Sequence, residues 1–256
     1  MISVNIANIE KSDCILKSAY LLSCQLKKEF GIVWFLDIGE TKVQVEREIA
    51  DKIKQLELTQ VRTYIIDYKS ESIESFCEKN ESSFLFIQLE DEKSKTIKGL
   101  LNNCRNLRIP YVYWKSSFSQ LDINQAVLPI GFLEEELEKA QFASAFGRFC
   151  QSQIHMLLAN DYGSKAKRNA EKMQNLFDKF NLPYTLSTAK SDSFKVEMEA
   201  IEFATKVNGG IIIISASRDY GLDDIFFGPK EFHVIRKSEI PILLVNPRGD
   251  LYALCD

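Results

Sequence analysis

Side chains that could catalyse a reaction are few in this chain of 256 residues. There are two histidines, His155 in the apolar run QIHMLLA and His233 in a short helix-like segment. Neither has a Cys, Ser or Asp at the spacing of a recognisable nucleophile–base motif. The phosphate-loop pattern Gly-x-x-x-x-Gly-Lys-Ser/Thr is also missing. The sequence therefore predicts packed or solvated histidines and no active site.

Six cysteines could hold zinc or form disulfides, but none belongs to a Cys-x-x-Cys pair. Zinc sites and disulfide frameworks require clustered spacing. We therefore predict no metal site, and thiols that are buried in a reducing cytoplasm. The cysteines are Cys14, Cys24, Cys77, Cys104, Cys150 and Cys255.

Three consecutive acids, Glu134–Glu136, are candidates for paired-carboxylate acid–base chemistry. They also stand where a helix is expected to begin, and carboxylates in a first helical turn complement the helix dipole. We favour this second interpretation, because exposed acids are common in first turns. The sequence then offers no catalytic residue.

The segment best suited to bind a ligand follows the apolar run Ile211–Ser215. It contains Gly221 and Gly228 and leads into a helix-like stretch near Lys230–Lys237. Small residues let backbone amides approach phosphate, and a following helix adds the positive end of its dipole. Open α/β sheets place ligands at the carboxyl ends of their strands. Three further residues would line this cleft: Ser215, Ser217 and Arg218.

The composition limits the class of protein to which these residues belong. Apolar residues make up 45% and charged residues 27%, which suits a globular protein with a buried core. The net charge of −4 argues against a protein that grips nucleic acid or anionic lipid over a broad surface. No apolar stretch approaches the ~20 residues that span a bilayer, and the first residues do not read as a signal peptide. We expect a cytoplasmic protein.

Short apolar runs alternate with longer amphipathic ones in the first half of the chain, which indicates strands and helices in turn. The first helix is expected to carry Ile15, Ala19, Leu22 and Phe30 on its apolar face and to end at Gly31. Strands are expected at residues 2–7, 32–38, 61–68, 83–89 and 109–114, and the later helices at 43–56, 72–79 and 94–103.

The polar, aperiodic segment 115–125 separates this half from a second series of the same kind. There, Phe194, Met198 and Ile201 are expected to form the apolar face of one helix. Strands are expected at residues 126–132, 153–159, 184–189, 211–215 and 240–245, and helices at 133–150, 166–180, 194–205 and 230–237.

Each half thus repeats one pattern and ends with an Ile-Pro step into an apolar strand, at Ile109-Pro110 and Ile240-Pro241. Alternating strands and helices of this length predict parallel sheets with right-handed crossovers and helices on both faces. The fold class is therefore α/β, with two tandem doubly wound domains of five mostly parallel strands each. We place the domains at residues 1–116 and 125–248.

The second half resembles the universal stress protein family, which has an adenine nucleotide α-hydrolase-like fold. The resemblance rests on the segment IIIISASRDYGLDDIFFGPKEFHVIRKSEIPILLVNPR, which matches the family's closing hallmark in order, length and hydrophobic register. That hallmark is a strand, Gly-x-x-Gly, nine residues, Gly-Ser/Thr, a short helix and an Ile-Pro-Val strand. The first half resembles the family in architecture, with FLFIQLEDEKSKTIKGLL in place of the glycine loop. The family includes tandem two-domain members.

In family members that bind nucleotide, the glycine loop wraps ATP. Here Ala216 and Asp219 stand at the two first glycine positions, and Pro229 replaces the hydroxyl residue after Gly228. At the end of the first strand, Gly131 stands where the family's Asp reaches the nucleotide, and Ala7 takes that place in the first half. The resemblance thus implies a vestigial nucleotide site: Gly131, Ser215, Ala216, Ser217, Arg218, Gly221 and Gly228.

These departures favour a non-catalytic stress-response or regulatory protein that acts through protein partners, with no cofactor. The alternative is a universal stress protein that binds ATP or AMP in its second domain, with slow or no hydrolysis. An adenine nucleotide α-hydrolase enzyme is a third reading, but its His-x-Gly-His and Ser-Gly-Gly-x-Asp loops are missing.

The resemblance also bears on assembly, because subunits of the family often associate along their last strand. Both closing strands, PYVYW and PILLV, are apolar on both faces and would otherwise leave exposed sheet edges. We therefore expect the two halves to pack as an intramolecular pseudo-dimer, with a homodimer as a further option and no nucleic acid or membrane partner.

Overall fold

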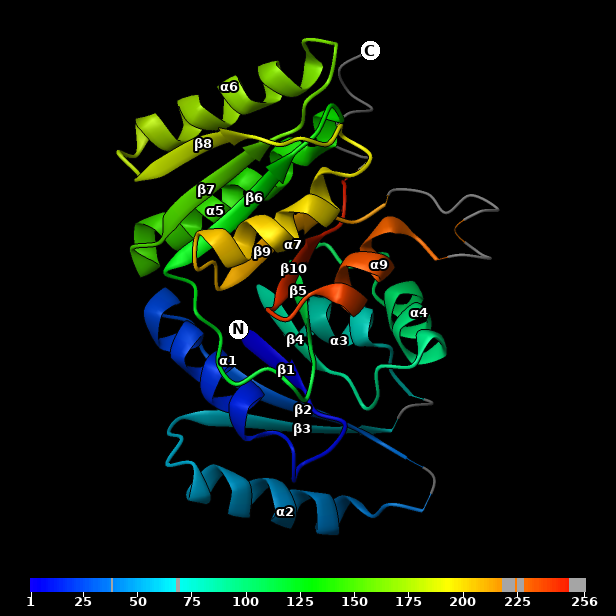
Figure 1. The fold of residues 1–256 in the computed structure, drawn as a ribbon. Helices are drawn as coiled ribbons and strands as arrows, with labels where there is room; N and C mark the ends of the chain where they lie inside the picture. The colour runs from blue at the N-terminus through cyan, green and yellow to red at the C-terminus, as the bar shows by residue number, and fades with distance from the viewer. Residues whose placement is uncertain (38, 68–69, 218–223, 225–227, 249–256) are drawn as a thin grey trace. The chain divides into compact units, whose positions relative to one another are not determined.

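The computed structural model describes residues 1–37, 39–67, 70–217, 224 and 228–248. The chain divides into two compact units, Met1–Leu121 and Asp122–Asp256 (Figure 1). Strands and helices alternate through each unit, as the periodicity predicts.

The first unit has a parallel sheet with the strand order β3-β2-β1-β4-β5. Its first strand is central, and the chain winds outward first on one side and then on the other. The elements are β1 (Ile2–Asn5), α1 (Asp13–Leu26), β2 (Phe30–Leu36), α2 (Lys42–Gln55), β3 (Val61–Asp67), α3 (Ile73–Lys79), β4 (Phe84–Gln88), α4 (Ser94–Asn103) and β5 (Tyr111–Trp114).

The second unit repeats this winding, with the order β8-β7-β6-β9-β10 and parallel pairing throughout. The prediction of two doubly wound, five-stranded α/β sheets is therefore confirmed. The elements are β6 (Gln125–Ile130), the 3₁₀ turn η1 (Glu134–Glu136), α5 (Leu137–Cys150), β7 (Gln153–Leu158), α6 (Lys165–Lys179), β8 (Tyr184–Thr188), α7 (Val196–Lys206), β9 (Ile211–Ser215), α9 (Lys230–Lys237) and β10 (Ile242–Val245).

The central strands are apolar along their whole length because helices cover both faces of each sheet. Helix α5 packs against α6, and α7 packs against α9, which gives the second unit its two helical layers (Figure 1). Strand β9 lies between them, and the side chains of Ile211–Ile214 have no exposed surface. None of the helices among the described residues is long and apolar enough to cross a membrane.

Two expectations about helix faces are wrong. The first helix ends at Leu26, where Lys27 adopts a left-handed conformation (φ 53°) and its amide bonds to Ser23 and Cys24 carbonyls. Phe30 and Gly31 belong to β2, so Phe30 is buried in the sheet and not on the helix. Phe194 precedes α7 and is 79% exposed. The buried face of that helix is made by other residues: Val196, Glu197, Ala200 and Ala204.

The parallel register brings two strand ends together in each unit. Val127 of β6 pairs with Ile212 of β9, so Gly131 and Ala216 follow neighbouring strands at the carboxyl edge. The crossovers change direction between these two strands. In the first unit, β1 and β4 have the same relationship. Such switch points are where doubly wound sheets bind ligands.

Candidate functional site

The switch point of the second unit is occupied by a carboxylate of the chain itself. The Gly131 amide donates a 2.6 Å hydrogen bond to Oε2 of Glu136. The same oxygen accepts a bond from Nζ of Lys139 at 3.3 Å. The 3₁₀ turn after β6 folds Glu136 back toward the strand end, and the carboxylate is only 4% exposed. Lys139, one turn further on, has no exposed surface.

This arrangement corrects the expectation for the acidic run Glu134–Glu136. Only Glu134 behaves as an exposed first-turn acid, and it pairs with Lys172 at the surface. Glu136 instead forms a buried ion pair with Lys139. The sequence pattern could not separate the two, because adjacent acids in a turn look alike until the turn's direction is known.

Two more acids extend the buried charge. Glu197 of α7 accepts a 2.9 Å bond from Nζ of Lys230, the first residue of α9. Glu231 has no exposed surface, and it accepts a 2.8 Å bond from the Ser217 hydroxyl and a longer one from the Ser217 amide. We call Glu136, Lys139, Glu197, Lys230 and Glu231 the buried charge cluster, although the Lys230 side chain is 35% exposed.

The surroundings of Glu197 and Lys230 raise the pKa of both groups. Burial raises the pKa of Glu197, and the charges of Lys230 and Lys139 offset that effect only in part. Burial alone would lower the pKa of Lys230, but the carboxylates of Glu197 and Glu136 raise it above the ordinary lysine value. With three acids and two lysines, the ionised cluster carries a net charge of −1.

The structure brings together four residues of the predicted site at the carboxyl edge: Gly131, Ser215, Ala216 and Ser217. Ser215 is 3% exposed, and its hydroxyl has no hydrogen-bond partner in the described part of the chain. The Ala216 amide continues the sheet by donating to Val245. Arg218 and Gly221, which also belong to the predicted site, lie outside the described residues, as does Asp219.

Gly228 has a reason to be glycine that is independent of any ligand. Its φ is +89°, in the left-handed region that other residues rarely adopt, and its amide bonds to the Asp224 carbonyl. Pro229 follows as the N-cap of α9 with a φ of −66°, which suits proline. These two residues therefore form a helix entry.

The first unit has a matching feature that sequence reasoning missed. Gln88, at the end of β4, is 5% exposed. Its Oε1 accepts the amides of Ala7 at 2.9 Å and Asn8 at 2.8 Å, and its Nε2 donates to the Lys11 carbonyl. In both units, therefore, a side chain of the chain itself binds the amide that follows the first strand. The signal that the sequence offers for this contact is a polar residue, Gln88, at the end of an apolar run.

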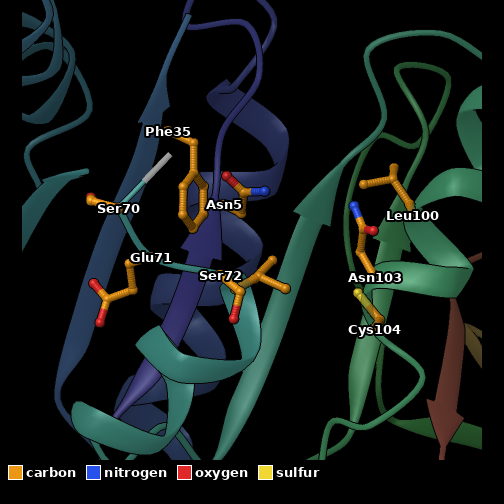
Figure 2. Close-up of a pocket in the computed structure, with 9 residues that line it drawn as sticks. Asn5, Phe35, Ser70, Glu71, Ser72, Leu100, Asn103 and Cys104 are labelled. Atoms are coloured by element: carbon orange, nitrogen blue, oxygen red, sulfur yellow. The ribbon is translucent and has the colours of Figure 1, made fainter. Parts of the chain in front are cut away.

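A cleft of about 440 Å³ also opens in the first unit (Figure 2). The side-chain amides of Asn5 and Asn103 line it and make no hydrogen bond with the described residues. Among the residues that the structure describes, its lining contains Glu71 but no lysine or arginine. The described lining residues are Asn5, Phe35, Ser70, Glu71, Ser72, Ile73, Leu100, Asn103 and Cys104.

Both histidines belong to the second unit, His155 on β7 and His233 on α9. His155 bonds to Gln125 and Thr185 on the neighbouring strands, and burial lowers the pKa of His155. His233 packs against Phe232. Among the residues described, no group of three or more His, Cys, Asp or Glu side chains could hold a metal ion.

No protein-family model and no curated protein matches this sequence. Among solved structures, a universal stress protein from Archaeoglobus fulgidus DSM 4304 is similar, with a TM-score of 0.66, 14% identity and 97% of each chain covered. A putative universal stress protein from Pseudomonas aeruginosa UCBPP-PA14 has a TM-score of 0.66 and 12% identity, covering 99% of this chain and 95% of its own. The chain therefore has the universal stress protein fold along nearly its whole length, as the resemblance implies.

Proposed function

We propose that this chain is a tandem universal stress protein that regulates other proteins without catalysis and without bound nucleotide. One observation carries the proposal: the Glu136 carboxylate binds the Gly131 amide, at the strand end where the family's nucleotide site would lie. We place the two domains at residues 1–116 and 125–248, and the protein in the cytoplasm.

The physical argument concerns charge and free amides. A phosphate site needs unhindered backbone amides and positive potential. Here the amide after β6 is already bonded, and the buried charge cluster is negative overall. A bound triphosphate would have to displace the Glu136 carboxylate from both the Gly131 amide and Lys139. Nucleotide binding must therefore break a buried ion pair before the phosphate can contact Lys139, and the displaced carboxylate loses its partners.

Thermal unfolding with ATP tests the proposal. A ligand at 100 times its Kd stabilises the folded state by about 2.7 kcal/mol, which shifts the melting temperature of a ~100-residue domain by about 4–8 °C. We expect millimolar ATP to shift the melting temperature by about a degree or less, and no more than tripolyphosphate does. We also expect no nucleotide in the mass spectrum of freshly purified, denatured protein.

A clear ATP-specific shift, or co-purified ATP or AMP, would contradict the proposal. It would favour the alternative, a second domain that binds ATP or AMP at Gly131, Ser215, Ser217 and Gly228 with slow or no hydrolysis. Soaking or titration followed by structure determination would then place the ligand. A ligand bound beside Gln88 alone would contradict both readings.

A second candidate function rests on the cleft of the first unit. Asn5 and Asn103 offer unpaired amide donors and acceptors beside the Phe35 ring, and the described lining residues include no lysine or arginine. These features favour an uncharged, hydrogen-bonding ligand over a phosphorylated one. If adenosine raises the melting temperature of the unmodified protein but not that of the Asn103→Leu variant, this role is supported. The exposed Asn102→Leu is the matched control.

The association of the two closing strands remains a proposal. Within its own unit, each closing strand is the last of the sheet. We propose that β5 and β10 associate in an intramolecular pseudo-dimer. Oxidation of a Tyr113→Cys/Leu243→Cys variant tests it: a monomeric cross-linked species supports the proposal, and a species linked only between chains points to a homodimer instead.

A further inference from the structure

A second cleft, of about 690 Å³, lies at the amino edge of the sheet in the first unit, opposite to the switch point. It is bounded by the end of α1, the start of β2 and the start of β3, where Phe30 pairs with Val61. Its volume is within the range of small-molecule sites. Its lining residues are Tyr20, Ser23, Cys24, Lys27, Lys28, Glu29, Phe30, Thr59, Gln60, Val61 and Arg62.

The charge of this cleft is opposite to that of the whole chain. Lys27, Lys28 and Arg62 contribute three positive charges and Glu29 one negative charge, so the lining carries +2, although the chain carries −4. Glu29 contacts the Arg62 guanidinium. A guanidinium has five N–H donors, so this contact leaves Arg62 able to bind a second anion.

Two aromatic residues are among the other residues that line the cleft, Tyr20 at its surface and Phe30 almost fully buried. The Tyr20 and Phe30 rings meet edge to face at 5.5 Å between centroids. The Tyr20 hydroxyl is 2.8 Å from Oγ1 of Thr59, which ties α1 to the loop before β3. An aromatic wall beside two lysines suits a ligand with an apolar body and negatively charged groups.

We infer that this cleft binds a small organic anion with at least two negative charges and an aromatic or apolar body. The site is distinct from the switch points and does not depend on the proposed function. The lysines lie on consecutive positions after α1, and the left-handed turn at Lys27 ends that helix beside the cleft.

Calorimetric titration of the full chain tests the inference with two trianions at low salt, benzene-1,3,5-tricarboxylate and citrate. We expect saturable binding of the aromatic trianion, weaker binding of citrate, and a decline of both affinities with added salt. The Lys27→Asn/Lys28→Gln variant should bind about tenfold more weakly, since each exposed charge contact contributes up to about a factor of five. Asparagine tolerates the left-handed conformation of position 27.

The matched control is Lys165→Gln/Lys167→Gln, which removes two exposed lysines from α6 of the second unit and should leave the affinity unchanged. In the unmodified protein, the aromatic trianion should slow alkylation of Cys24, which lines the cleft and is exposed. This second measurement does not depend on the folding of a variant. Absence of saturable binding, equal losses in both variants, or unprotected Cys24 would overturn the inference.

Discussion

The Gly131 amide and the Glu136 carboxylate, five residues apart in the sequence, are joined by a hydrogen bond of 2.6 Å. Glu136 also pairs with Lys139, which lies wholly inside the protein. The chain therefore neutralises a buried lysine and satisfies a strand-end amide with one side chain. A carboxylate of the chain itself thus occupies the end of β6.

Removal of this carboxylate should expose the anion-binding character of the site. We expect Glu136→Ala to destabilise the second unit by about 3–5 kcal/mol, because Lys139 becomes an uncompensated buried charge. Phosphate or sulfate should restore part of the stability by replacing the carboxylate. Urea unfolding with and without phosphate measures both effects. The control Glu135→Ala should change stability little, and loss of stability without anion rescue would show that no anion fits there.

Gly131 should tolerate no side chain. A Cβ built at this position would lie 2.9 Å from Oε1 of Glu136 and 3.0 Å from the Ser193 hydroxyl, so one of them must move. We expect Gly131→Ala to cost about 1–3 kcal/mol, as overpacked interiors do. Gly163→Ala is the control, since no atom lies within 4 Å of its Cβ position. Equal unfolding midpoints for the two variants would contradict this account.

Gln88 should stabilise the first unit, as Glu136 stabilises the second. Gln88→Leu keeps most of the side-chain volume but leaves the Ala7 and Asn8 amides without their acceptor. Ala7 is exposed and Asn8 half-buried, so water can reach these amides; at about 0.5–1.5 kcal/mol for each lost hydrogen bond, we expect a loss of about 1–3 kcal/mol. Hydrogen exchange should then accelerate at these two amides. Gln44→Leu, which removes an exposed glutamine of α2, is the control, and a similar loss there would contradict the prediction.

The cysteines should differ in reactivity. Burial raises the pKa of Cys77 and of Cys104 to about 12, and that of Cys150 to about 11. Their thiolates are therefore scarce at neutral pH, and their sulfur atoms are sheltered. Cys24 is exposed, so the expectation that all the thiols are buried is wrong for this residue. Cys255 lies outside the described residues. Among the five cysteines that the structure describes, peptide mapping after brief maleimide treatment at pH 7 should find Cys24 modified first. Early labelling of Cys77 or Cys104 would contradict the described packing.

The architecture of each unit could be predicted from the amino-acid sequence. The continuous apolar runs at Ile211–Ser215 and Phe84–Gln88 could only be strands covered on both faces, and the helical periodicity between such runs required crossovers. Helix α4 occupies Ser94–Asn103 and α9 occupies Lys230–Lys237, as the periodicity predicts. The spacing of apolar residues was sufficient there. In a layered fold, the residues of a helix or strand that face the core recur with the period of that element.

The contacts made at the strand ends could not be predicted from the sequence, because they depend on how the chain folds in space. Nothing in the spacing of Gly131, Glu136 and Lys139 distinguishes a buried ion pair from an exposed acidic turn, because the direction of a turn depends on the strand that it leaves. Gln88 likewise reaches Ala7 across 81 residues, through the pairing of β1 with β4. The amino-edge cleft joins Lys27 and Lys28 to Arg62 for the same reason: parallel pairing places residues side by side that are remote along the chain.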